Sequence, residues 1–398
     1  MQIDHITFSK TGGAGIVAQT LAKAQKALGH DVQLHTVIDS DLRTDPLRKP
    51  ELTLAAAADN WLVSSQLEPT LFSPLRANLQ TFDRSEIRAD SIVHLHWMTG
   101  VLNQHALKNL LESGRKVVWT MHDMNPFTGG CHHSHSCENF ISDCSNCPQA
   151  RSVFRKTVTL NLQKKLLTQK YLNLRIVSPT IWMSKQASIS SVFREQECSV
   201  VPNAIDDGFF AETNQLEARK TLGIPLADFV GVVIAKDLSD PNKNIDFVIR
   251  TFEQVSLSTH RPLSLLLIGK NGASYSSSTI NLHSVGELTV KDIPAIACAA
   301  DVMISGSIAE SAGMTIAECA AMGIPSIALE NGGTSSLISD GVNGLLAQNL
   351  ESFVEQILSL VNDPAKLLLL KKACKQNSDL YSAIRIAKQY VEIYESLG

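Results

Sequence analysis

The chain has 398 residues, of which 44% are hydrophobic and 19% are charged, a balance typical of a globular protein long enough for two domains. No apolar run reaches the ~18 residues that a membrane-spanning helix needs, and no basic and apolar leader indicates secretion, so we expect a cytoplasmic protein. A net charge of −4 gives no general reason to bind nucleic acid. The eight cysteines are expected to be thiols or metal ligands, because disulfides are rare in a reducing compartment.

The chain opens with a predicted strand, glycine-rich turn, helix and second strand, at residues 3–9, 12–15, 16–28 and 32–38. The turn carries Gly13-x-Gly15-x-x-Ala18, the spacing of a dinucleotide-binding loop, and Asp39 stands about where a ribose-binding acid would lie. An NAD-dependent oxidoreductase that holds its cofactor at Gly13 is therefore one hypothesis for this chain.

Histidines accompany the next two predicted strands. In the strand at 91–97, alternation places His94 and His96 on one face, and we interpret them as core residues in preference to site residues. The buried strand at 117–121 ends directly before His122. Open α/β sheets bind ligands at the carboxyl ends of their strands, so this position favours a site role for His122.

A polar segment with few large apolar groups follows, and it contains four cysteines: Cys131, Cys137, Cys144 and Cys147. Cys144-x2-Cys147 has the spacing of a structural zinc site, which two more thiolates would complete, although five residues separate the first pair in place of the usual two to four. The alternative is four reduced thiols in a flexible loop. If one thiol pairs poorly with a metal, a nearby histidine could replace it, from the set His132, His133 and His135.

Residues 151–175 contain seven Lys or Arg and no acid, interleaved with apolar residues, and this pattern predicts a basic amphipathic helix or helix pair. Two interpretations remain open. The segment is either a solvated basic face or a surface that is attracted to anionic membrane headgroups, at roughly 1 kcal/mol per basic group.

A second series of alternating strands and helices begins with a buried strand at 229–235. Lys236 emerges at the end of that strand, and Lys243 opens the next helix after a turn at 240–242. Two cations at the carboxyl end of a strand suit the binding of a diphosphate.

The most informative stretch is 305–329, which follows a predicted buried strand at 301–304 and contains a loop and then a helix at 313–322. Glu310 falls in the loop. Glu318 falls on the helix among small apolar residues, and no Lys or Arg three or four residues away could pair with it.

The start of the same helix is a predicted phosphate site. Its free backbone N–H groups belong to Gly313, Met314 and Thr315, and a glycine allows a ligand to approach the backbone closely. Carboxylates accept hydrogen bonds from vicinal hydroxyls. An acid at each end of a bound diphosphate, Glu310 and Glu318, therefore indicates a nucleotide sugar.

The Glu310-x7-Glu318 pattern resembles that of the retaining GT-B glycosyltransferases of family 4. Further segments agree with this family in the same order along nearly the whole chain, namely TGGAG at 11–15, VHLHW at 93–97, TMHDMNPFTGGC at 120–131, VPNAID at 201–206 and NKNID at 242–246. The segment at 120–131, with its cysteines, resembles most closely a subgroup that builds bacterial exopolysaccharides of the colanic-acid type.

The resemblance implies an α/β fold of the GT-B type, in which two Rossmann-like doubly wound domains face a cleft. An N-terminal acceptor-binding domain would occupy 1–202, and a nucleotide-sugar donor domain would occupy 203–377. A C-terminal helix at 378–398 would cross back to the N-terminal domain.

The implied reaction moves a sugar from a UDP- or GDP-sugar to a hydroxyl of a growing, lipid-linked cell-surface or exopolysaccharide glycan, with retention of configuration. A donor phosphate oxygen would take the acceptor's proton, and no metal cofactor would be needed for catalysis. The expected partners are the donor, the glycan acceptor and an anionic membrane surface on the cytoplasmic side, and no nucleic acid.

The resemblance also implies roles for single residues. Glu318 would hold the ribose, Glu310 the transferred sugar, and His122 the donor's sugar or diphosphate. Lys236 and Lys243 would stabilise charge on the leaving diphosphate, although the family often has Arg where Lys236 stands. The oxidoreductase hypothesis gives the two glutamates no purpose. A zinc-loop nucleic-acid module is likewise disfavoured, because it leaves two α/β domains unexplained.

Overall fold

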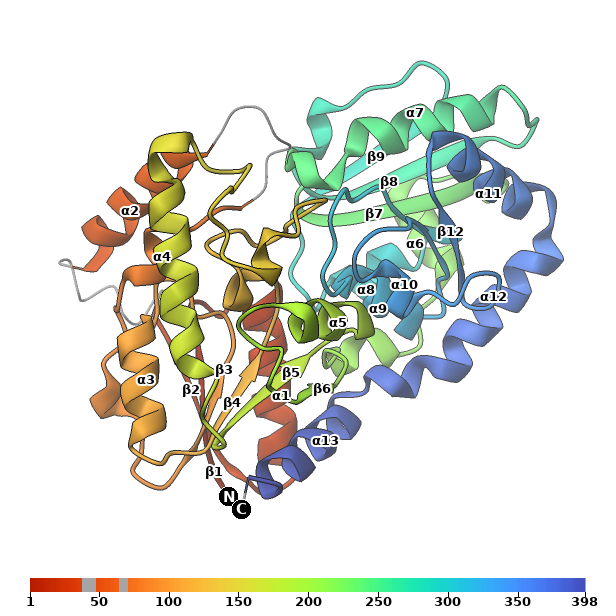
Figure 1. The fold of residues 1–398 in the computed structure, drawn as a ribbon. Coiled ribbons are helices and arrows are strands. Elements are labelled where there is room, and N and C mark those ends of the chain that lie inside the picture. Colours follow the sequence, from red (N-terminus) through yellow and green to blue (C-terminus); the bar gives the residue numbers. More distant parts are fainter. Residues whose placement is uncertain (38–47, 64–70, 398) are drawn as a thin grey trace. The chain divides into compact units, whose positions relative to one another are not determined.

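The computed structural model describes residues 1–37, 48–63 and 71–397, and it divides the chain into two compact units (Figure 1). The first unit comprises Met1–Ala204 together with Ala383–Gly398, and the second comprises Ile205–Ser382. Within the described residues, each unit contains one six-stranded sheet in which every strand pairing is parallel. The predicted α/β fold with two Rossmann-like domains is confirmed.

The sheet of the first unit has, in spatial order, the strands β2 (Asp31–Thr36), β1 (Gln2–Thr7), β3 (Ile92–Leu95), β4 (Val117–Thr120), β5 (Leu174–Ser178) and β6 (Cys198–Val200). Every residue of β3 and β4 is buried, because helices cover both faces of a parallel sheet. The carboxyl ends of these two parallel strands lie at the same edge, and His96 and His122 follow there.

The helices of the first unit are α1 (Gly13–Ala27), α2 (Arg48–Leu62), α3 (Gln104–Glu112), α4 (Arg155–Lys165), α5 (Ile181–Ile189) and α13 (Ala383–Glu395). The last of these, α13, packs against α1 (Figure 1). It buries Tyr390 and Tyr394 almost completely, and both hydroxyl groups are hydrogen-bonded, as buried phenols require.

The sheet of the second unit has, in spatial order, the strands β12 (Gly344–Ala347), β11 (Ser326–Leu329), β10 (Val302–Ser305), β7 (Phe229–Asp237), β8 (Leu263–Lys270) and β9 (Asn281–Gly286). Its helices are α6 (Gln215–Leu222), α7 (Ile245–Ser256), α8 (Ile293–Ala297), α9 (Met314–Ala321), α10 (Thr334–Leu337), α11 (Leu350–Asn362) and α12 (Pro364–Asn377). Helix α6 ends at Gly223 in the left-handed conformation, and Asp363 caps α12 by accepting from the Lys366 N–H at 2.9 Å.

No helix among the described residues combines the length and the apolar character that a transmembrane span requires.

Candidate functional site

The loop between β10 and α9 adopts a conformation that two glycines permit, one at its end and one that follows β11. Gly313 precedes α9 with φ of 51°, and an added Cβ would lie 2.5 Å from Leu337 Cδ1. Gly332 has φ of 48°, and its added Cβ would lie 2.1 Å from the main-chain oxygen of Glu310. A larger residue at either position would displace the Glu310 loop or force an unfavourable backbone angle.

Of the three backbone N–H groups predicted to bind phosphate, one already has an acceptor in the structure and two do not. The Gly313 N–H donates to Glu310 Oε1 at 3.1 Å, so it is already occupied, contrary to the prediction that it is free. The N–H groups of Met314 and Thr315 have no acceptor among the described residues. These two remain directed to solvent or a ligand at the start of α9.

Glu310 lies beside Lys243. The Glu310 Oε2 atom is 3.5 Å from the Lys243 Nζ atom, and both side chains are partly exposed. The structure therefore brings together an acid and a cation that are far apart in the sequence. Lys236 is exposed near the end of β7, and its side chain has no hydrogen bond or ion pair with a described residue, so the structure does not join it to this pair.

Asn242 holds the Glu310 loop in place, a role that its sequence position did not reveal. Its side-chain amide bonds the main chain of Ala309 twice, as donor and as acceptor, at 2.9 Å each. Its main-chain oxygen accepts from the Ile308 N–H at 2.9 Å. The NKNID segment was informative only as a family pattern, because these contacts span more than 60 residues of sequence.

Glu318 is buried in α9 with no partner for its charge. The side chain is 7% exposed, and among the described residues its carboxyl group has no hydrogen bond and no ion pair. Burial, with a smaller contribution from the negative charge of Asp206, raises the pKa of Glu318 to about 8. Buried polar groups in proteins are normally paired, so this carboxyl group is a strong candidate for ligand binding.

The glycine-rich turn in the first unit has a structural explanation. Gly12 has φ of 81° and precedes α1, which begins at Gly13. An added Cβ at Gly15 would lie 2.1 Å from the main-chain oxygen of Ser9, so this glycine lets α1 pack closely on the preceding turn. Asp39, the proposed ribose-binding acid of the dinucleotide pattern, lies outside the described residues.

His122 follows β4 and is partly exposed, whereas His94 and His96 are buried, in agreement with their interpretation as core residues. The Nε2 atom of His122 lies 3.0 Å from Nδ1 of His96. Burial lowers the pKa of His122 to about 4, although the nearby Asp123 acts in the opposite direction. The imidazole is therefore neutral at pH 7, and it lines a small cavity together with Trp97 and Asp123.

His132 is committed to other contacts and is a poor substitute ligand for zinc, contrary to the alternative from sequence. Its Nδ1 atom lies 2.8 Å from Asp123 Oδ2, its Nε2 atom lies 3.0 Å from Ser73 Oγ, and Trp97 stacks on its ring. Burial alone would raise the pKa of Asp123, but His132 holds it below its ordinary value.

The cysteine loop packs into the core of the first unit. Cys131, Cys144 and Cys147 are buried, and all four thiols line one small cavity with Phe140 and Val158. A flexible loop is therefore the wrong description. The thiols are not gathered around one point, because the only three ligand groups within 4.8 Å of one another, in the part of the chain that the structure describes, are histidines elsewhere.

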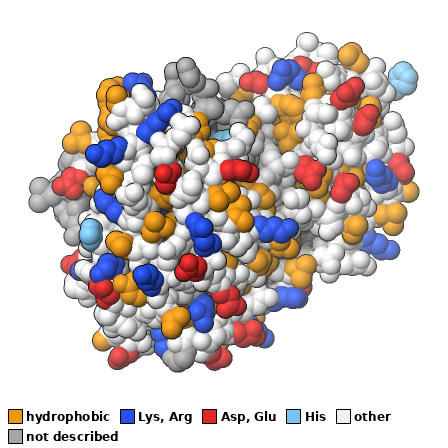
Figure 2. All heavy atoms as spheres, viewed as in Figure 1, with side chains coloured by type: hydrophobic (Ala, Val, Ile, Leu, Met, Phe, Trp, Pro, Cys, Tyr) orange, Lys and Arg blue, Asp and Glu red, His pale blue; other side chains and the backbone are white. Residues whose placement is uncertain are grey.

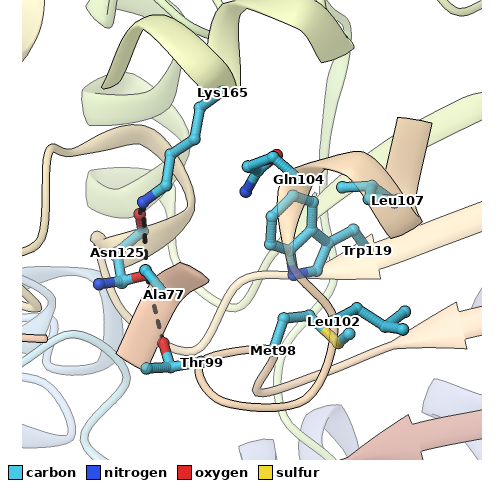
Figure 3. Close-up of a pocket in the computed structure, with 9 residues that line it drawn as sticks. All are labelled: Ala77, Met98, Thr99, Leu102, Gln104, Leu107, Trp119, Asn125 and Lys165. Carbon is cyan, nitrogen blue, oxygen red and sulfur yellow. Dashed lines mark hydrogen bonds between the residues drawn. The ribbon is translucent and has the colours of Figure 1, made fainter. Parts of the chain in front are cut away.

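The predicted helix of the basic segment is present as α4, with a short 3-10 turn directly before it at 152–154 and another directly after it at 166–168. Its buried face is not purely apolar, because it carries Asn161 and Lys165 besides two apolar residues. Lys165 is 2% exposed, and its Nζ atom donates to the main-chain oxygen of Asn125 (Figure 3). The same atom also donates to the main-chain oxygen of Thr128. Burial lowers the pKa of Lys165 to about 8. This cation therefore stabilises the interior and is unavailable to a membrane.

Family comparisons identify the chain. The family model for Glycosyltransferase Family 4 matches residues 11–209, and the model for Glycosyl transferases group 1 matches residues 229–363. The chain belongs to glycosyltransferase family 4. This glycosyltransferase has the two-unit GT-B fold, and nothing in the comparisons supports the oxidoreductase alternative.

Relatives and solved structures agree with the family at low identity. The D-inositol 3-phosphate glycosyltransferase of Corynebacterium urealyticum is 21% identical and covers 97% of this chain and 91% of the relative. WcaC of Escherichia coli (strain K12), a protein named for colanic acid biosynthesis glycosyl transfer, is also 21% identical over 77% of this chain and 75% of WcaC. The structure of Anabaena Alr3699/HepE in complex with UDP-glucose superposes with a TM-score of 0.67 at 16% identity, over 100% of both chains.

Proposed function

We propose that this glycosyltransferase moves a sugar from a nucleoside-diphosphate sugar, with uracil or guanine as the base, to a hydroxyl of a growing lipid-linked glycan. The observation that carries this proposal is the buried and unpartnered carboxyl group of Glu318 on the helix whose first turn presents the N–H groups of Met314 and Thr315. A ribose diol fits the first group, and a diphosphate fits the second. The UDP-glucose bound to the Anabaena protein supports this donor class.

The main electrostatic task of the reaction is to stabilise negative charge on the leaving diphosphate. Lys243 lies within ion-pair distance of Glu310 in the loop, and Lys236 lies on β7, the parallel strand beside β10. Glu310 would accept hydroxyl hydrogens of the transferred sugar while its other oxygen keeps the Gly313 N–H. We expect retention by attack from the leaving-group side, in which a donor phosphate oxygen takes the acceptor's proton, so the chemistry assigns no catalytic metal.

The proposed acceptor is a bacterial surface or exopolysaccharide chain held at a membrane. Similarity to WcaC supports the polysaccharide part. The membrane part rests on α4 and the short turn before it at 152–154, where the exposed apolar side chains of Leu160 and Val153 belong to a segment with cations and no acid. Figure 2 shows blue Lys and Arg and orange hydrophobic side chains together in the region where Figure 1 places α4. Such a surface suits the anionic inner face of a membrane.

The cysteine loop would carry a structural zinc ion if its four thiolates converge. Burial raises the pKa of the Cys147 thiol, and the nearby main-chain N–H groups of Ala150 and Gln149 act in the opposite direction, toward the thiolate. Zinc would close the loop without an open coordination position, so it would supply no chemistry to the transfer.

A panel of nucleotide sugars tested by thermal shift would identify the donor. A ligand at 100 times its dissociation constant stabilises a protein by ~2.7 kcal/mol, so the correct nucleotide should stand out clearly. We expect stabilisation by a UDP- or GDP-sugar and none by NAD. Stabilisation by NAD alone would overturn the proposal.

A further inference from the structure

A continuous chain of hydrogen bonds runs through the interior of the first unit, from the C-terminal helix α13 to His122. In order, the bonded pairs are Tyr390–Thr120 (2.7 Å), Thr120–His94 (2.8 Å), His94–Tyr394 (2.6 Å), Tyr394–Gln25 (2.9 Å), Gln25–His5 (2.7 Å), His5–His96 (2.9 Å) and His96–His122 (3.0 Å). It connects α13, β4, β3, α1 and β1, and every member except His122 is buried.

The histidines in this chain are neutral at pH 7. Burial lowers the pKa of His5 to about 4 and the pKa values of His94 and His96 well below their ordinary range. A neutral imidazole has one nitrogen that donates and one that accepts. The proton position on one ring therefore determines the proton position on the ring bonded to it.

Gln25 sets the direction of the branch that leads to His122. Its side-chain oxygen faces His5 Nε2, and its nitrogen donates to the Tyr394 hydroxyl. His5 must then donate from Nε2 and accept at Nδ1. Because Nδ1 of His5 faces Nε2 of His96, the next ring donates from Nε2 and also accepts at Nδ1.

The same alternation of donor and acceptor nitrogens applies to the last pair of rings, His96 and His122. The Nδ1 lone pair of His96 faces Nε2 of His122, so His122 carries its proton on Nε2. Its Nδ1 atom is then an unprotonated acceptor, and the structure gives this atom no hydrogen bond to a described residue. A reversed Gln25 amide would invert all three rings and leave a proton on Nδ1 of His122.

We propose that Gln25 is a positioning residue of this glycosyltransferase, which acts through His5 and His96 to fix the proton of His122 on Nε2 and present a lone pair at Nδ1. The side chain of Gln25 does not itself reach the site, since two rings separate it from His122. The hydroxyl of Tyr394 on α13 accepts a hydrogen bond from the amide nitrogen of Gln25, so the C-terminal helix also helps to fix the orientation of this amide.

A metal ion is a weaker explanation of the same cluster. The rings of His5, His94 and His96 place ligand atoms within 4.8 Å of one another. However, each of their six nitrogen atoms already has a hydrogen-bond partner, and the rings of His94 and His96 stack at 4.3 Å between centroids. An ion would have to break several of these bonds, whereas the hydrogen-bonded chain satisfies every ring as it stands.

The chemical consequence for a ligand rests on the proposed function. A lone pair at Nδ1 accepts a hydrogen from a sugar hydroxyl, whereas a phosphate oxygen would need an N–H group there. The tautomer predicted here therefore directs His122 toward the sugar of the donor and away from its diphosphate.

The tautomer can be measured without any substrate. NMR spectra of the full-length protein with ¹⁵N-labelled histidine distinguish protonated from unprotonated ring nitrogens, and His122→Gln identifies the signals of His122 by their loss. We expect Nε2 protonated and Nδ1 unprotonated in the wild type. A proton on Nδ1 of His122 would overturn the proposal, whatever the variants do.

Gln25→Met tests the role of the amide with a side chain of similar size. We expect His122 to lose its single tautomer, and kcat with the nucleotide sugar to fall roughly fivefold, the factor that one lost hydrogen bond typically represents, with little change in KM. Tyr390→Phe is the matched control, because it removes a buried hydroxyl at the other end of the chain and should leave His122 protonated on Nε2. An unchanged His122 tautomer in Gln25→Met rejects the inference. A changed tautomer without any sugar transfer by the wild type rejects the proposed function alone.

Discussion

Glu318 is the residue whose surroundings most clearly require a ligand, because its buried carboxyl group has no partner in the described protein. Glu318→Ala should weaken nucleoside diphosphate binding by ~1 to 3 kcal/mol, the range for a buried group that loses its hydrogen-bond partner, as measured by calorimetry. Glu310→Ala should spare nucleotide affinity and lower turnover of the intact donor. Glu351→Ala, an exposed acid on the same unit, is the control. Equal nucleotide affinity of wild type and Glu318→Ala would contradict the assignment.

The raised pKa of Glu318 makes a second prediction, about stability. Its folded-state pKa of about 8 lies above the ordinary value of 4.5, so between these values the folded protein keeps a proton that the unfolded chain has released. The stability contribution is therefore fully present below about pH 4.5 and is lost as the pH rises through about 8, at up to about 1.4 kcal/mol per pH unit. The free energies of unfolding of wild type and Glu318→Gln, measured with urea, should therefore differ by an amount that changes with pH across this range. A difference that does not vary with pH would show that Glu318 is ionised in the folded state.

At the residue scale, the sequence identified as site candidates those side chains whose role is visible in a short stretch of sequence. The spacing of Glu310 and Glu318 and the apolar neighbours of Glu318 are visible in a short window. Gln25 was missed because its partner Tyr394 lies 369 residues away, and such a contact exists only in the folded chain. No local signal distinguishes a buried Gln that orders three histidines from one on a solvated face.

At the scale of elements, the alternation of buried strands and helices was predictable because parallel sheets bury continuous apolar runs. The basic segment was not predictable in the same way. Composition places Lys165 with the surface cations, whereas the fold uses it to satisfy two carbonyl oxygens inside the first unit. A buried lysine is rare enough that charge patterning alone assigns it to the surface.

The cysteine loop makes a prediction that decides between zinc and plain thiols. If the four thiols close on a zinc ion, protein purified under reducing conditions without chelator should contain about one equivalent of zinc, with Zn–S distances near ~2.3 Å by X-ray absorption. Cys144→Ser and Cys147→Ser should each lower the metal content, whereas Cys374→Ser, a buried cysteine in the second unit, should not. Metal-free wild type would leave the loop as packed thiols. That outcome is physically reasonable, because Phe140 and three of the cysteines already belong to the core.

At the scale of the whole molecule, two sheets in one chain follow from two separate series of alternating strands and helices. The family assignment extends this to glycosyl transfer, since its models match both series. The sequence alone could not predict which side chains are exposed, because exposure depends on which side of each helix is covered by the rest of the unit. For α4, the outward side carries Lys156 and Leu160, while Leu162 and Lys165 face inward.

This outward side of α4, together with the exposed Lys170 that follows the helix, makes the last prediction, which concerns membrane attachment. Lys156→Ala with Lys170→Ala should reduce sedimentation with anionic liposomes, because both cations are exposed and each contributes roughly 1 kcal/mol of attraction near a charged surface. Added salt should have the same effect on the wild type, since it screens exposed charges. Lys26→Ala with Lys185→Ala removes the same charge from α1 and α5 of the first unit and should leave sedimentation unchanged. If both double variants lose binding equally, the attraction is a general charge effect. If the wild type ignores anionic liposomes at low salt, α4 presents only a solvated basic face.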